Sequence, residues 1–337
     1  MSKKKILILD FLAIGDILFT TPLLETVRKN FESAKIIMSV RKNVKDILLY
    51  NNDIDELILY DKKGKHNTLL GYISYVNKLR TINADIVLTL QDNPRLALLT
   101  YFSKAPKRIG FVDNYLRKLF YTDPIRPNKE KHRVEYYLDL ARVMKNIKDI
   151  KNNGLKLNIT DKEKKWAKWI LNKHNVNLKK KIIGLHIGGT WETKRWPVEK
   201  FAKLGEKLIE YGFEVIILGG PQDVEDSIKI EKYMKKKVIN FAGKTTLLQL
   251  TGLLDYFNLF ISGDTGPLHM AVARNTKSLA IFGPSEVWRY RPYGEKHEVI
   301  KMNLKCQPCH EKKCPFNWEC MNNLKVEDVF KKALTLL

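Results

Sequence analysis

The residues best suited to chemistry gather in segment 261–271, ISGDTGPLHMA, which follows a short apolar run. This order predicts a strand, a glycine-bracketed loop and then a helix. Thr265 and the Gly266 amide would stand at the N-terminus of that helix, where free N–H groups and the helix dipole favour an anion. Asp264 is itself an anion, so sugar hydroxyls suit it better than phosphate. His269 lies one turn into the helix, where contact with a bound ligand and a purely structural role are equal alternatives.

A second loop, residues 187–197 (IGGTWETKRWP), has the residue types that bind a diphosphate. Gly188 and Gly189 let the backbone approach phosphate, the Thr190 hydroxyl can donate to it, and Lys194 and Arg195 can neutralise it. The spacing matches neither a Walker A loop nor a dinucleotide fingerprint. A glycine turn beside an exposed basic pair explains the same residues, so this loop carries weight only together with the others.

A third loop, residues 218–223 (LGGPQD), ends another apolar run. Asp223 could accept hydrogen bonds from ribose hydroxyls at such a strand end. A Gly-Gly-Pro turn followed by a helix-capping Asp223 explains the loop equally well.

In the first half of the chain, the informative segment is residues 10–22, DFLAIGDILFTTP. Asp16 follows Gly15 at a predicted strand-to-helix junction, where parallel sheets present reactive groups. It is the only acid so placed near the start of the chain, which makes it a candidate general base. The alternative is that Asp16 caps the following helix.

All four cysteines, Cys306, Cys309, Cys314 and Cys320, lie within fifteen residues of one another. A CxxC pair followed by two more thiols is compatible with a structural tetrahedral zinc site. Reduced, unligated thiols are the favoured alternative, and a disulfide is less consistent with the other features of the chain.

Short apolar runs separated by segments of helical spacing predict the elements that position these loops. The expected strands are residues 5–10, 35–40, 56–60, 85–90, 181–186, 214–218, 238–241, 259–262 and 278–282. Alternation of strand and helix predicts an α/β protein with mostly parallel sheets. The polar stretch 147–160 reads as a linker, which predicts two doubly wound Rossmann-like domains, 1–155 and 156–337, facing a central cleft. The last segment, 325–337, is expected to be a helix that can return to the first domain.

The net charge of +23 is large and is spread over both halves of the chain. A concentrated basic tail, as in many nucleic-acid-binding proteins, is therefore not evident. The charge suits either an ordinary lysine-rich surface or attraction to an anionic acceptor or membrane. Asp10 and Asp16 interrupt the first apolar stretch, so we expect neither an export signal nor, further along, a membrane-spanning helix.

These segments resemble the signatures of the ADP-heptose:lipopolysaccharide heptosyltransferases, glycosyltransferase family 9. The matching motifs are Gly15-Asp16 with Thr21-Pro22-Leu23-Leu24, Lys194-Arg195-Trp196-Pro197, and Gly263-Asp264-Thr265-Gly266-Pro267-Leu268-His269 with Phe282-Gly283-Pro284. They occur in the family's order and span nearly the whole chain.

The resemblance implies a GT-B fold, with an ADP-heptose donor bound mainly by the C-terminal domain. The acceptor would be a sugar of the lipopolysaccharide inner core, an anionic glycolipid, held by the N-terminal domain. The transfer would be inverting and would need neither metal nor cofactor, with Asp16 in the position of the general base. A cytoplasmic enzyme in peripheral contact with the inner membrane follows from such an acceptor. Nucleic acid is not an implied partner.

Residue by residue, Lys194 resembles the lysine that contacts the donor phosphates, and Thr190 a phosphate-binding hydroxyl. Asp264 resembles the acid near the donor sugar, and the adjoining donor loop corresponds to Thr265, Gly266 and His269. The chain departs from the family in two places. Gly189 stands where some members have a second threonine, and Asp223 matches the ribose-contacting acid only if the register shifts by one from Gln222.

Two rival interpretations remain at this stage. A GT-B transferase that uses another nucleotide sugar has the same loops, while a nucleic-acid-binding protein is suggested by the charge alone and leaves the loops unexplained.

Overall fold

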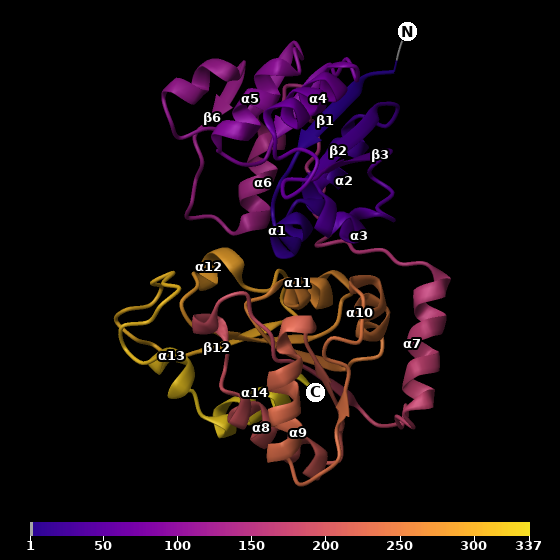
Figure 1. Ribbon diagram of the computed structural model, residues 1–337, viewed down its shortest axis with the longest axis vertical. Coiled ribbons are helices and arrows are strands. Elements are labelled where there is room, and N and C mark those ends of the chain that lie inside the picture. Colours follow the sequence, from indigo (N-terminus) through magenta and orange to yellow (C-terminus); the bar gives the residue numbers. More distant parts are fainter. Residues whose placement is uncertain (1–2) are drawn as a thin grey trace. The chain divides into compact units, whose positions relative to one another are not determined.

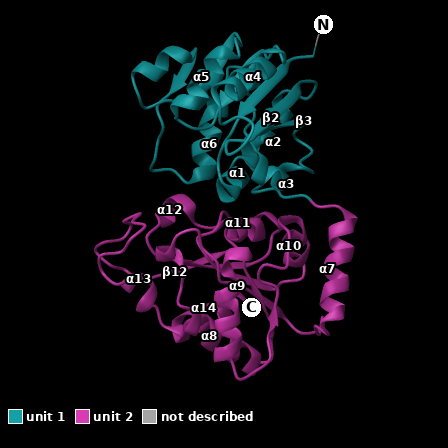
Figure 2. Cartoon of the chain, viewed as in Figure 1, with its two compact units in different colours: residues 1–158 teal, residues 159–337 magenta. Residues whose placement is uncertain are grey.

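The computed structural model describes residues 3–337, and the chain divides into two compact units that meet at Asn158 and Ile159 (Figure 2). Each unit contains one six-stranded sheet in which every neighbouring pair of strands is parallel. Helices link the strands in both units (Figure 1). The α/β class and the doubly wound sheets predicted from the alternation of apolar runs are confirmed.

The first sheet has the strand order β3-β2-β1-β4-β5-β6. Its elements are β1 (Lys5–Leu9), α1 (Ile14–Phe19), α2 (Thr21–Asn30), β2 (Lys35–Arg41), η1 (Lys42–Val44), α3 (Lys45–Leu48), β3 (Glu56–Tyr60), α4 (Leu69–Arg80), β4 (Ile86–Thr89), α5 (Pro94–Phe102), β5 (Lys107–Phe111), η2 (Leu116–Phe120), β6 (Asp123–Ile125) and α6 (Arg133–Arg142). This is the order of a dinucleotide-binding Rossmann sheet, in which the direction of winding reverses between β1 and β4.

The first sheet forms where it does because its central strands are apolar on both faces. Leu7 and Leu9 of β1 pack in one cluster with Ile37 of β2 and Val87 of β4, and all four are buried. Strands covered by helices on both sides need such continuous apolar runs. Asn93 begins α5 by accepting a hydrogen bond from the Leu96 N–H at 2.9 Å, followed by a proline in the first turn. Both features are common at helix starts.

The second sheet repeats the same topology in the order β12-β11-β10-β7-β8-β9. Its elements are α7 (Asp161–Lys173), β7 (Ile182–His186), η3 (Glu192–Lys194), α8 (Val198–Glu210), β8 (Glu214–Leu218), η4 (Pro221–Asp223), α9 (Val224–Tyr233), β9 (Ile239–Asn240), α10 (Leu247–Leu254), β10 (Leu259–Gly263), α11 (Gly266–Ala273), β11 (Ser278–Phe282), α12 (Val287–Tyr290), β12 (Glu298–Lys301), α13 (Glu319–Asn322) and α14 (Val326–Leu336). Its winding reverses between β7 and β10.

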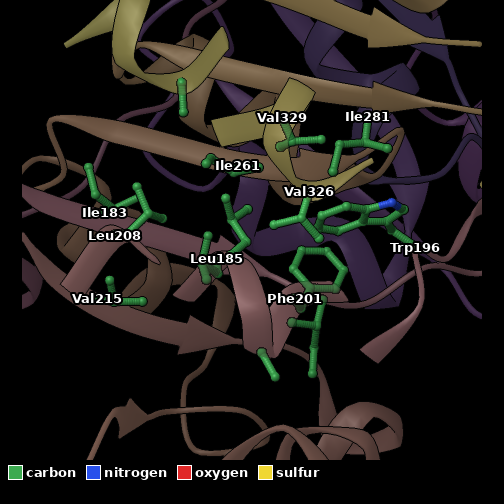
Figure 3. Packing of buried hydrophobic residues seen from close by; sticks show 14 of the residues in the cluster. Ile183, Leu185, Trp196, Phe201, Leu208, Val215, Ile261, Ile281, Val326 and Val329 are labelled. Atoms are coloured by element: carbon green, nitrogen blue, oxygen red, sulfur yellow. The ribbon is translucent and has the colours of Figure 1, made fainter. Parts of the chain in front are cut away.

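One face of the second sheet carries a large core that includes the end of the chain. Figure 3 shows the Trp196 indole beside Phe201 and Val326, and the two aromatic rings meet edge to face with centroids 5.1 Å apart. Helix α14 packs on α8 and on the strands of this sheet, and Val329 is fully buried. The expectation that the last helix can return to the first domain is therefore corrected: its apolar face is buried within the second unit.

The segment expected to be a linker is mostly part of the first unit. The Lys151 carbonyl accepts a hydrogen bond from the Thr26 hydroxyl at 2.8 Å, and the Asn158 amide donates to the Tyr50 carbonyl at 2.9 Å. The segment is polar because it lies on the surface of the first unit and is held there by hydrogen bonds rather than by apolar contacts. The structural division, after Asn158, lies three residues beyond the boundary expected from composition.

Three strands were absent from the sequence-based expectation. β5, β6 and β12 contain charged residues, and β6 includes Pro124, so none forms a clean apolar run. β6 and β12 lie at sheet edges, where such residues are tolerated. None of the helices within residues 3–337 is long and apolar enough to cross a bilayer.

Candidate active site

Three of the four predicted site loops stand at the points where the winding of a sheet reverses. In the first unit the loop after β1 leads to Asp16, beside the β1–β4 reversal. In the second unit, the loops after β7 and β10 lie on either side of the β7–β10 reversal and contain Lys194 and Asp264. At such a point the connections that follow the two neighbouring strands run to opposite faces of the sheet. This opens a crevice at the carboxyl edge of the strands, where ligands of such sheets bind.

Asp16 lies in the first turn of α1, and its side chain is 28% exposed. Both Nε and Nη2 of Arg133 approach its Oδ1 at 3.2 Å. The N-cap of α1 is Ala13, three residues earlier, so the alternative interpretation of Asp16 as the cap is wrong. The carboxylate is instead held by a cation and remains partly open to solvent, as an acid that contacts substrate requires.

Sequence reasoning missed Arg133, which the fold brings to Asp16 from 117 positions along the chain. Arg133 begins α6 and is buried, with its guanidinium 4.6 Å from the Tyr136 ring centroid and 4.5 Å from that of Tyr137. These rings restrict the guanidinium through cation–π contacts. The sequence around residue 133 has no pattern that would predict contact with an acid near the N-terminus.

A second carboxyl group, Asp10, lies at the end of β1 and is fully buried. Its Oδ1 accepts a hydrogen bond from the Leu12 N–H at 2.9 Å, while its Oδ2 has no hydrogen-bond partner among the described residues. Burial raises the pKa of Asp10 to about 7, the Asp16 charge adds to this, and Arg133 and Arg41 oppose it. The first unit therefore pairs a solvent-accessible carboxylate with a buried carboxyl that retains its proton in mild acid.

We expect Asp10→Asn to remove a pH dependence of stability. The unfolded chain ionises Asp10 near its ordinary pKa of 3.8, whereas the folded chain keeps the proton until about pH 7. Stability therefore falls as pH rises from about 4 to 7, and the full penalty is present above that range. Asn cannot ionise and can still accept from Leu12, so its gain at pH 8 should reach roughly 4 kcal/mol and vanish near pH 4.

Urea unfolding of the parent and of Asp10→Asn at pH 4, 6 and 8 measures this gain. Parallel pH profiles for the two proteins would contradict a protonated, buried Asp10.

In the second unit, Lys194 and Asp264 come from different strand ends and form an ion pair of 2.6 Å between Nζ and Oδ2. His269 reaches the other oxygen of Asp264, with Nε2 3.8 Å from Oδ1. Burial tends to raise the pKa of Asp264, but the hydrogen bond from His269 and the charge of Lys194 outweigh it and hold that pKa well below its usual range. Asp264 is thus a permanent anion with a cation on one side.

Helix α11 begins as the sequence predicts, with Thr265 as its N-cap and Gly266 as its first residue. The Thr265 side chain accepts no hydrogen bond from the helix N–H groups. Its hydroxyl lies 2.9 Å from the Ser262 hydroxyl instead. The amides of the first turn therefore remain available to an anion, beside the Lys194–Asp264 pair.

The loops after β7 and β8 are joined by Asp223, which is fully buried. Its Oδ2 accepts from the Gly220 N–H at 2.8 Å, and its Oδ1 pairs with Arg195 Nη2 at 2.8 Å. A Cβ on Gly188 would stand 2.3 Å from Asp223 Oδ2, so this position requires glycine. Asp223 therefore connects two loops in this structure and has no surface with which to meet ribose. Arg195 is paired with carboxylates of the protein on both sides, because it also forms an ion pair with Asp226 at 3.1 Å.

Two residues in these loops are exposed, Thr190 and Gln222, although the Gln222 side-chain amide also donates to Asp223 Oδ2 at 3.2 Å. Thr190 is exposed next to Gly189, as a phosphate-binding hydroxyl would be. Gln222, one position before Asp223, is exposed as well. Asp223 matches the family's ribose-contacting acid only if the alignment shifts by one residue from Gln222. Because Gln222 is exposed and Asp223 is buried, the structure disfavours that shift.

The cysteine-rich segment contacts the loop after β11 and the loop that contains Lys194. The N–H groups of Cys309 and His310 donate to the Pro284 carbonyl at 3.1 and 3.0 Å, and the Thr193 hydroxyl donates to the Glu311 carbonyl at 2.8 Å. This segment therefore clamps the turn after β11 to the residue that precedes Lys194.

The four thiols are reduced and line a single cavity of about 50 Å³. Burial raises the pKa of Cys320 to about 11, and the neighbouring cysteines add to the shift. Among residues 3–337, no group of three or more His, Cys, Asp or Glu side chains is arranged to hold a metal ion. The four thiols converge on one cavity, and a structural zinc site there stays a hypothesis.

Taken together, the second unit offers a lysine, a helix N-terminus and an ionised acid at one strand edge, which suits a diphosphate joined to a sugar. The first unit offers a partly exposed carboxylate at the equivalent edge.

Several known proteins are similar to this chain over nearly its whole length. Lipooligosaccharide heptosyltransferase 2 of Campylobacter jejuni is 27% identical over 331 residues, covering 96% of this chain and 95% of that protein. The crystal structure of a family 9 glycosyl transferase from Veillonella parvula superposes with a TM-score of 0.91 at 28% identity, covering 100% of this chain and 98% of that one. The structure of Escherichia coli ADP-heptose lps heptosyltransferase II, at 22% identity, shares the fold with a TM-score of 0.80 and covers 98% of both chains.

The sequence profile of Glycosyltransferase family 9 (heptosyltransferase) matches residues 73–319, from α4 to the start of α13. The match includes the Lys194 loop, the Asp264 loop and the first three of the four cysteines. Because it covers well over half of the chain, this protein belongs to glycosyltransferase family 9, the heptosyltransferases.

Proposed function

We propose that this enzyme transfers a heptose from ADP-heptose to a sugar hydroxyl of the lipopolysaccharide inner core. The observation that carries the proposal is the Lys194–Asp264 pair, which joins two strand ends beside the free N-terminus of α11. The names of the similar Campylobacter and Escherichia proteins point to the same donor and acceptor classes. In this proposal the second unit binds the donor and the first unit binds the acceptor.

The donor diphosphate would be held by Lys194, the Thr190 hydroxyl and the amides at the start of α11. These groups are cationic or donate hydrogen bonds, and they oppose the charge that grows on ADP as it leaves. Asp264 would accept hydrogen bonds from the heptose hydroxyls, because it stays ionised and repels phosphate. Gly188 and Gly189 keep the loop backbone close to the bound nucleotide.

Asp16 would act as general base in a single displacement that inverts the anomeric carbon. The acceptor oxygen forms a bond to that carbon as the carbon–oxygen bond to ADP breaks on the opposite side, and the acceptor proton passes to Asp16. Arg133 would position the carboxylate through its two contacts with Oδ1. The reaction needs both sites at once, since the acceptor hydroxyl and the anomeric carbon must be in contact.

The acceptor would be an anionic glycolipid, so we place the enzyme in the cytoplasm, in peripheral contact with the inner membrane. The net charge of +23 would draw it to such a surface. Nucleic acid is not a proposed partner.

The most direct test is mass spectrometry of transfer and hydrolysis with ADP-heptose beside UDP- and GDP-sugars. Faster turnover of a different nucleotide sugar would favour the nearest rival, a GT-B transferase with another donor. Calorimetry with ADP and with random duplex DNA tests the remaining rival, a nucleic-acid-binding protein. Such a protein would bind DNA with an affinity that falls steeply as salt is raised, and it would not bind ADP.

We expect transfer to proceed without a divalent metal. Lys194 and the α11 N-terminus already supply positive charge for the leaving diphosphate, which is the part a metal plays in other transferases. Brief treatment with EDTA, under conditions in which circular dichroism shows an intact fold, should leave the initial rate unchanged. Immediate loss of activity that added Mg²⁺ or Mn²⁺ restores would overturn this account of the leaving group. Slow loss together with unfolding would instead indicate a metal that supports the cysteine-rich segment.

A further inference from the structure

The first unit carries an exposed apolar surface that its fold does not explain. Tyr115 is 79% exposed, Leu119 74% and Leu116 69%, all in or beside η2. Tyr101 and Phe102, at the end of α5, are exposed as well. We call these five residues the η2 patch. Large apolar side chains gathered in this way usually mark an interaction surface.

The patch lies on two elements that pack together, and its backbone is anchored. Helix α5 packs on η2, and the Tyr101 ring lies 5.4 Å from that of Phe102 and 5.5 Å from that of Phe120. Arg117 forms a two-pronged contact with Asp92, with Nε–Oδ1 at 2.7 Å and Nη2–Oδ2 at 2.9 Å. Leu116 and Leu119 are therefore exposed on η2, whose position is held by the packing of α5 and by the Arg117–Asp92 contact.

The segment that carries the patch has a net positive charge. Segment 101–120 contains five basic residues and one acid, Asp113, which itself pairs with Lys129 at 3.4 Å. The basic residues are Lys104, Lys107, Arg108, Arg117 and Lys118. Arg108 and Lys118 lie over the rings of Tyr101 and Tyr115, 6.0 and 5.9 Å from their centroids. Apolar and aromatic side chains fringed by cations match the interface of an anionic bilayer, with its apolar interior beneath negative headgroups.

We propose that the η2 patch docks this enzyme on an anionic lipid bilayer, with Leu116 and Leu119 inserted between the headgroups. This inference rests on the proposed function, in which the acceptor is anchored in such a bilayer. A second copy of the chain is a poorer occupant, because a symmetric contact would bring two strongly basic surfaces together.

The patch is connected to the proposed acceptor side of the reaction within the same unit. Asp92, which holds Arg117, follows Gln91, and the Gln91 side chain accepts a hydrogen bond from the Phe11 N–H at 3.2 Å. Phe11 lies in the loop that leads from β1 to Asp16. A bilayer bound at η2 is thus linked by two side-chain contacts to the loop that presents the base.

The test compares binding of the full-length protein to vesicles of phosphatidylglycerol and phosphatidylcholine, by co-sedimentation, with the variant Leu116→Ser/Leu119→Ser. We expect the variant to bind about tenfold more weakly, because two inserted apolar side chains are lost. The parent should bind pure phosphatidylcholine poorly, and its binding to the anionic vesicles should weaken as salt is raised. Leu178→Ser/Ile228→Ser, which alters two exposed apolar residues of the second unit, should bind as the parent does.

Equal vesicle binding by the parent and Leu116→Ser/Leu119→Ser would overturn the proposal. So would a loss confined to Leu69→Ser/Leu70→Ser, a competing exposed pair at the start of α4, or a change from dimer to monomer in light scattering without a change in vesicle binding. The rate of heptose transfer to a delipidated, water-soluble core oligosaccharide should be the same in the parent and in Leu116→Ser/Leu119→Ser. That assay fails for the parent if the proposed function is wrong, whereas vesicle binding requires neither donor nor acceptor.

Discussion

Asp16→Asn should lower the turnover of heptose transfer by about two to four orders of magnitude, the usual contribution of a general base. Asn has nearly the same shape and can still accept a hydrogen bond from Arg133, but it cannot take the acceptor proton. ADP affinity should stay nearly unchanged, because Asp16 belongs to the first unit and the proposed diphosphate site to the second. Initial rates with ADP-heptose and calorimetry with ADP measure the two quantities.

The structure makes this substitution more decisive than the sequence alone allowed. Ala13 is the N-cap of α1, so loss of a helix cap cannot account for a fall in turnover. Asp46→Asn is a matched control, because Asp46 is also an acid in the first turn of a short helix of the first unit. It should keep the parent rate. If Asp16→Asn transfers heptose at close to the parent rate, the base lies elsewhere and the mechanism fails.

Lys194→Ala should weaken ADP binding by roughly 1.5 to 3 kcal/mol, the range for hydrogen bonds to charged groups, or about 10- to 150-fold in Kd. Lys194 forms a 2.6 Å ion pair with Asp264, in the loop that precedes α11. The variant should also be less stable, because Asp264 has a side chain only 9% exposed and would lose the cation that compensates its burial. Calorimetry with ADP and thermal unfolding separate these two effects.

Lys312→Ala provides the control for Lys194, since both ammonium groups lie over the Trp191 ring, 5.5 and 5.0 Å from its centroid. Only Lys194 reaches the α11 loop through an ion pair with Asp264. We therefore expect Lys312→Ala to bind ADP almost as the parent does. Equal weakening in both variants would mean that general positive charge attracts ADP, and an unchanged Kd in Lys194→Ala would remove this lysine from the donor site.

The cores and the order of elements were largely readable from the sequence, because a strand buried on both faces must be apolar along its whole length. Runs such as 5–10 and 278–282 therefore predicted β1 and β11 to within a residue or so. β5 and β12 were missed for the complementary reason. Their sequences, KRIGF and EVIK, mix charge with apolar residues, and only pairing with a neighbouring strand makes them part of a sheet.

The site shows the same division. Local sequence determined the start of α11 at Gly266, since helix starts depend on a few consecutive residues. The need for glycine at position 188 is tertiary, because a Cβ there would stand 2.3 Å from Asp223 Oδ2. Whether a polar side chain faces ligand or protein depends on what the fold places opposite it. Asp223, a candidate ribose contact by spacing, is buried against Arg195, while Arg133 reaches Asp16 from the far end of the first unit. Such pairings need the tertiary structure, because they join residues whose separation along the chain has no periodic signature.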